Sequence, residues 1–86
     1  MPVSKKIVPL SECQPGDCFL LRELKVEGVM RRRLLDLGFV AGAEILVLQK
    51  SPLGDPVAFR VSHTTIALRE EESSLIFGEI IRRGPA

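Results

Sequence analysis

The sequence contains no tryptophan, tyrosine or asparagine, one histidine and two cysteines. These absences exclude a Cys/His zinc finger, a cysteine nucleophile supported by histidine and asparagine, and asparagine-linked glycosylation. No apolar run approaches the roughly 20 residues that a membrane span needs. Two lysines lie near the N-terminus, but no apolar run of signal-peptide length follows them. We therefore expect a cytoplasmic protein.

No excess of one charge is present, since 12 lysines and arginines face 11 aspartates and glutamates. Sequence-independent binding to nucleic acid needs a concentrated basic surface, and single-strand binders add aromatic stacking platforms. Four phenylalanines are the only aromatic residues, and Phe19, Phe59 and Phe77 lie in apolar segments that are typical of a core. We expect no nucleic-acid partner.

The length of 86 residues and the apolar fraction of 45% predict one small folded domain over residues 1–86. We place its core at about residues 9–81, and we expect both termini, including the tail from Arg82 to Ala86, to be frayed.

Catalytic and metal-binding groups are scarce. The six serines share one possible base, His63, and no Gly-Lys-Ser/Thr phosphate loop is present. Cys13 and Cys18 are too few for a disulfide framework, and a cytosolic chain would keep them reduced. We expect no enzyme, cofactor or metal site, although metal binding by Cys13, Cys18 or His63 stays open.

Residues 28–37 show the periodicity of a helix. Met30, Leu34 and Leu37 recur at i, i+4 and i+7, which places them on one helical face. Gly38 follows the last periodic residue, where a left-handed cap favours glycine, and the phenylalanine after it can fold back on Leu34. The sequence therefore predicts one helix that ends at Leu37.

The rest of the chain alternates short apolar segments with turn residues. Ser11 and Gln14 have the spacing of a capping box, so a helical turn is predicted there, and Pro15-Gly16-Asp17 should turn the chain. Val40–Ala43 suits a type II turn with Gly42 in third position, and the acidic run 70–74 suits a further helical turn. The apolar segments predict five strands, at residues 18–24, 44–50, 56–61, 65–69 and 75–81. This pattern favours a small antiparallel barrel, whose closure would remove exposed edges.

Three segments together resemble the family of ferrous iron transport protein A (FeoA). Residues 32–42 are similar to its "R-x-L-x-x-L-G-hydrophobic-x-P-G" motif, with Ala41 where the family usually has proline. Residues 51–57 resemble its "P-L-G-D-P" hairpin, and residues 65–69 resemble its "hydrophobic-A-L-R" strand. The positions that match are Leu34, Leu37, Gly38, Gly42, Pro52, Gly54, Asp55, Pro56, Leu68 and Arg69.

The resemblance implies an SH3-like barrel with a helix inserted after the first barrel strand. It also implies a non-enzymatic accessory protein that docks on FeoB, a membrane ferrous iron transporter with a cytoplasmic GTP-binding domain. The alternative is a metal-responsive regulatory domain like those of DtxR-type repressors. Because Met1 lies only a few residues before the matching part, the stand-alone form is favoured.

Four residues are candidates for contact with the partner: Met30, Arg31, Arg33 and Leu53. Leu53 has no turn-forming role at the tip of its loop, whereas the arginines could equally be a solvated helix face. Met30 and its neighbour Val29 could be core or a partner-facing apolar patch. Residues 75–81 carry more isoleucine than one inward face needs, so a homodimer through an apolar edge stays open.

Overall fold

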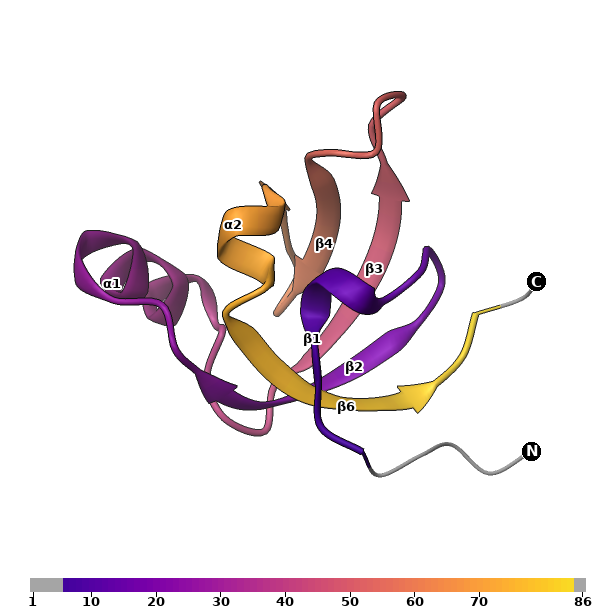
Figure 1. Cartoon of the computed structure of the whole chain (residues 1–86). Coiled ribbons are helices and arrows are strands. Elements are labelled where there is room, and N and C mark those ends of the chain that lie inside the picture. Colours follow the sequence, from indigo (N-terminus) through magenta and orange to yellow (C-terminus); the bar gives the residue numbers. More distant parts are fainter. Residues whose placement is uncertain (1–5, 85–86) are drawn as a thin grey trace.

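Six antiparallel strands form one sheet in the computed structural model, which describes residues 6–84 (Figure 1). The strand order is β1-β6-β2-β3-β4-β5. Two short helical turns and one longer helix accompany the sheet. In chain order the elements are β1 (Val8–Pro9), η1 (Leu10–Glu12), β2 (Cys18–Leu24), α1 (Gly28–Leu37), β3 (Glu44–Lys50), β4 (Val57–Val61), β5 (Thr64–Leu68), α2 (Glu70–Ser73) and β6 (Ile76–Arg82).

The five predicted strands and the predicted helix are all present, with shifts of one residue at some ends. The structure adds β1, which pairs with β6 and is too short to show a sequence pattern. Pro56 lies just before β4 rather than at its first position. Within residues 6–84 the edge strands β1 and β5 do not pair with each other, so hydrogen bonds do not close the barrel as predicted.

Burial follows the alternation of the strands. Three phenylalanines are the largest fully buried side chains, namely Phe19 on β2, Phe39 after α1 and Phe59 on β4. Phe77 differs from the prediction: it is half-buried, and the Lys25 ammonium lies 5.2 Å from its ring centre. It faces away from the core because its neighbours Ile76 and Gly78 on β6 take the buried positions.

The end of α1 confirms the predicted glycine cap. Gly38 has a φ of +110°, its N–H donates to Leu35 O at 3.1 Å, and the Phe39 N–H donates to Leu34 O at 2.9 Å. These two bonds define a Schellman motif, in which the residue after the glycine packs against the helix. Leu34 and Phe39 are both fully buried in the same core cluster. The cap therefore ends the helix and also places Phe39 in the core.

Two predicted turns are confirmed, and a third differs. The Ala43 N–H donates to Val40 O at 2.9 Å around Gly42, whose φ is +90°, as a type II turn requires. The Asp17 N–H donates to Gln14 O at 3.0 Å. The capping box at Ser11 and Gln14 was wrong, because the helical turn η1 begins one residue earlier and the Gln14 N–H donates instead to Asp17 Oδ2 at 2.8 Å.

Asp17 is a buried carboxylate that holds the C-terminal segment. Its side chain is 3% exposed and accepts hydrogen bonds from the Gln14 N–H, the Gly84 N–H at 2.9 Å and the Arg83 guanidinium at 3.3 Å. Arg82 is paired in β6. The prediction of a frayed tail was therefore wrong for residues 82–84, while residues 85 and 86 lie outside the described part.

Asp17→Ala is expected to lower the free energy of unfolding by about 2–3 kcal/mol, because it leaves two backbone N–H groups without their charged acceptor. Arg83→Ala is the matched control: its guanidinium is 63% exposed, so its loss should cost less than about 1 kcal/mol. Urea unfolding followed by far-UV circular dichroism measures both. Equal losses in the two variants would show that the ion pair, not the backbone bonds, stabilises this region.

Among the described residues, no helix is long and apolar enough to cross a membrane.

Candidate functional site

The helix α1 stands at one side of the sheet, and Arg31 ties its first turn to the end of β2 (Figure 1). The Arg31 guanidinium donates to the backbone oxygens of Leu24 and Val26. This arginine therefore has a structural role in holding α1, which the sequence did not indicate. No pattern could have shown it, because the acceptors are main-chain groups of another segment.

The predicted contact residues on α1 differ in their surroundings. Met30 is half-buried and packs against the core, as one of its two interpretations had it. Arg33 is exposed and, within the part of the chain that the structure describes, has no hydrogen bond or ion pair. Val29 lies one helical turn before Arg33 and is 81% exposed. We call Val29, Arg32 and Arg33 the α1 outer face.

Leu53, the fourth predicted contact residue, does not belong to α1. It is 95% exposed at the tip of the loop between β3 and β4. Figure 1 shows this loop at the top of the view and α1 at the left. The candidates on α1 and Leu53 therefore lie on different elements, and contact of either with a partner stays a prediction.

Asp55 connects the same loop to the start of α2. One carboxylate oxygen accepts the Glu70 N–H at 2.9 Å, and the other lies 3.8 Å from the Arg69 guanidinium. The Glu72 carboxylate accepts the Arg69 N–H at 3.1 Å and so caps the helical turn. Asp55 and Arg69 belong to two separate motifs of the family resemblance. In the structure their side chains lie close together, and their contacts fix the base of the loop.

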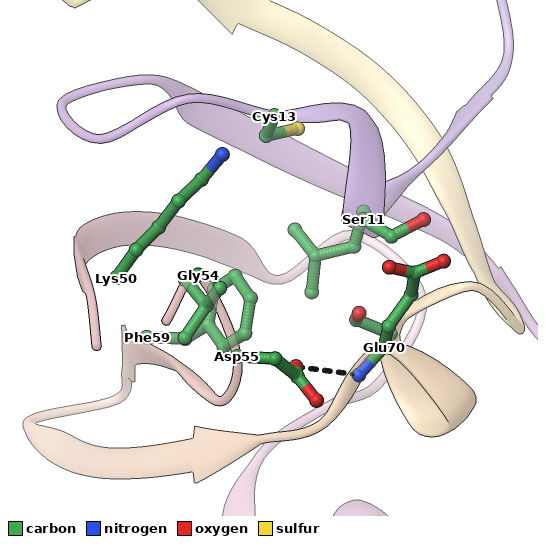
Figure 2. Close-up of a pocket in the computed structure, with 10 residues that line it drawn as sticks. Ser11, Cys13, Lys50, Gly54, Asp55, Phe59 and Glu70 are labelled. Atoms are coloured by element: carbon green, nitrogen blue, oxygen red, sulfur yellow. Dashed lines mark hydrogen bonds between the residues drawn. The ribbon is translucent and has the colours of Figure 1, made fainter. Parts of the chain in front are cut away.

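A small cavity of about 80 Å³ lies between η1, the loop after β3 and α2 (Figure 2). Lys50, Asp55 and Glu70 place charges of both signs around it. Lys50 Nζ donates to Gln14 Oε1 at 3.4 Å, and the Asp55 carboxylate is held by α2. Because Lys50 and Asp55 have partners within the chain and the cavity is small, we assign no ligand to it.

Both cysteine thiols are free and buried. Burial, with the nearby Asp17 charge as a second cause, raises the pKa of Cys13 from 9.0 to about 12. Burial also raises the pKa of Cys18, whose thiol donates to Glu44 Oε1 at 3.8 Å. At neutral pH both groups are therefore protonated, whereas nucleophilic attack and metal ligation require the thiolate.

His63 lies in the two-residue turn between β4 and β5 and is exposed. Within residues 6–84, no group of three or more His, Cys, Asp or Glu side chains is placed to hold a metal ion. The described structure therefore adds no observation in favour of the metal-responsive alternative.

A family model described as the FeoA domain matches residues 8–80. The chain belongs to the FeoA family. The match includes α1, the loop with Leu53 and the Asp55–Arg69 contact.

The comparisons extend to a fusion protein and to solved FeoA structures. The chain is 40% identical over 72 residues to a Porphyromonas gingivalis protein named Fe(2+) transport protein A/Fe(2+) transporter FeoB fusion protein. The match covers 84% of this chain and 8% of that protein. The chain thus spans a small part of the length of this curated relative.

Two solved structures share the fold. The solution structure of FeoA from Chlorobium tepidum is 36% identical, with a TM-score of 0.81, over 86% of this chain and 70% of that one. The crystal structure of Stenotrophomonas maltophilia FeoA complexed with zinc is 29% identical, with a TM-score of 0.73, over 83% and 88% of the two chains. The latter is described as a prokaryotic SH3 domain protein, so the predicted SH3-like fold is confirmed.

Proposed function

We propose that this chain is an accessory protein of ferrous iron transport, which docks from the cytoplasm on a FeoB-type membrane transporter. The observation that carries this proposal is the fusion relative, in which a domain 40% identical to this chain belongs to one polypeptide with a FeoB transporter. Covalent linkage holds two modules at high effective concentration, which is useful when the modules also associate as separate chains.

The proposed role is non-enzymatic. The buried thiols are protonated at neutral pH, and His63 lies in an exposed turn. A docked module changes transport only to the extent that its affinity differs between the states of the transporter. The accessory role therefore consists of favouring one state of FeoB by binding it more tightly.

We propose the α1 outer face as the docking surface. Val29 offers exposed apolar area beside the guanidinium of Arg33, which has no partner among the described residues. Exposed apolar side chains next to free charge are typical of protein contact sites. A partner that fits this surface presents an apolar contact next to carboxylates. Arg31 contributes by holding α1 in place rather than by contact with the partner.

Arg33→Glu is expected to weaken docking at least about tenfold, because it places a negative charge against an acidic partner surface. Tagged protein is bound to the detergent-solubilised membranes of its own cells at low salt, and the recovery of the FeoB-type transporter is quantified by mass spectrometry. Arg60→Glu is the matched control, since Arg60 is an exposed arginine on β4 rather than on α1. Leu53→Asp tests the loop in the same experiment.

The possible outcomes distinguish which of the two surfaces docks from whether the protein docks at all. Recovery that is lost only with Arg33→Glu assigns docking to α1, and loss only with Leu53→Asp assigns it to the loop. If wild-type protein recovers no transporter, the docking function is refuted. Far-UV circular dichroism of each variant checks that the fold is retained.

A further inference from the structure

The two edge strands of the sheet, β1 and β5, differ in their protection against pairing with a further strand. β1 has two residues, Val8 and Pro9, and proline has no N–H with which to pair a further strand. β5 has five residues, Thr64–Leu68, with no charge, proline or glycine. Natural proteins usually protect a free edge by shortness, charge or proline. β5 has none of these devices.

The turn before β5 fixes the direction of its hydrogen bonds. Ser62 and His63 have φ values of +48° and +68°, and positive φ at both positions defines a type I′ hairpin. In such a hairpin the residues that flank the turn, Val61 and Thr64, form a hydrogen-bonded pair, and bonded and non-bonded pairs then alternate along the strands.

This alternation places four backbone groups on the free edge. Ile66, opposite Phe59, directs its N–H and C=O toward β4. Thr65 and Ala67 belong to the non-bonded pairs, so their N–H and C=O groups point away from β4. The side chains of Thr65 and Ala67 are both exposed.

We propose that β5 pairs antiparallel with β5 of a second copy of this chain, around a two-fold axis at Ile66. In this register Thr65 lies opposite Ala67 of the second copy, and the reverse pair follows by symmetry. Both Thr65–Ala67 pairs are of the hydrogen-bonded type. The pairing therefore joins the four free N–H groups of the two strands to their four free C=O groups.

The side chains of β5 favour a second copy of this chain as the strand that pairs with its free edge. Ile66 is half-buried and would meet Ile66 of the other copy in a non-bonded pair, where side chains approach most closely. On the outer face Thr65 meets Ala67, which brings together two small uncharged side chains. No like charges lie opposite each other within the five residues, so the strand is complementary to itself.

The contact is small, since five residues on each side bury less than the roughly 800 Å² per partner of a standard interface. The dimer should therefore depend on concentration. Sedimentation equilibrium of the full chain from micromolar to millimolar concentration is expected to show the mass rising from 9.5 kDa toward twice that value. A constant mass of one chain over the whole range would overturn the proposal.

Ala67→Pro tests the edge, because it removes an outward N–H and leaves the bonds to β4 intact. Ala41→Pro is the matched control at an exposed turn position that accepts proline. Dimerisation should be lost with Ala67→Pro and kept with Ala41→Pro. Dimerisation that survives Ala67→Pro, or is lost in both variants, contradicts pairing through β5.

Amide hydrogen exchange of the unmodified protein provides a test without any substitution. Exchange at Thr65 and Ala67 should slow as the concentration rises, whereas exchange at Ile66, bonded to β4, should stay constant. A mass increase without this change at Thr65 and Ala67 would place the dimer contact elsewhere. This proposal is independent of docking to a transporter, so either can fail alone.

Discussion

Gly78→Ala is expected to cost about 3 kcal/mol or more of unfolding free energy and to leave little folded protein. Gly78 lies in β6 between Val8 of β1 and Leu21 of β2. An added Cβ would overlap Leu20 O and would lie 2.7 Å from the ring of Phe19. The overlap is with backbone and with a fully buried ring, so relief requires the two strands to separate.

Gly28→Ala is the control for the Gly78 substitution. A Cβ at Gly28 would have no atom within 4 Å outside its chain neighbours and its own helix backbone, although the φ of +71° is unfavourable for alanine. We expect a cost of about 1 kcal/mol. Urea unfolding followed by far-UV circular dichroism measures both variants, since no tryptophan or tyrosine is present for fluorescence. Equal midpoints for the two would contradict the steric argument.

The protein is expected to lose on the order of 4 kcal/mol of unfolding free energy between pH 9 and pH 12 because of Cys13. Burial in the core, and then the charge of Asp17, raise the pKa of this thiol from 9.0 to about 12. The folded state holds the proton more tightly than the unfolded state. The stabilisation is therefore complete below pH 9 and disappears as the pH rises toward 12.

Cys13→Ala should flatten this pH dependence, because alanine does not titrate. Cys18→Ala is the matched control; burial raises the pKa of Cys18 too, but this variant should keep the part of the slope due to Cys13. Urea unfolding at pH steps from 7 to 11 gives the slope, at about 1.4 kcal/mol per pH unit for one proton. A slope unchanged in Cys13→Ala would assign the alkaline loss to other groups.

The docking and dimer proposals use different parts of the surface. The α1 outer face carries Val29 and Arg33, whereas the dimer edge is β5. α1 meets the β4–β5 hairpin near its turn, where a Cβ on Gly38 would lie 2.9 Å from Ser62 Oγ. Charge reversal at Arg33 and proline at Ala67 therefore test separate properties of one molecule.

Local patterns in the sequence determined the elements. The spacing of Met30, Leu34 and Leu37 predicted α1, Gly38 predicted its end, and the alternation in residues 57–61 predicted β4 and its inward face. These features depend on the chain's own periods of 3.6 and 2 residues and on backbone preferences, so they can be read without a partner segment. The three motifs in register also indicated the family.

The tertiary structure alone decided how distant segments meet. It showed that Arg31 holds α1 through the oxygens of Leu24 and Val26, and that Asp17 binds residues 83 and 84. It also placed β6 inside the sheet between β1 and β2, so Phe77 and Gly78 pair with both neighbouring strands. The physical reason is that main-chain acceptors, sheet curvature and strand order belong to pairs of segments, and no single segment encodes them.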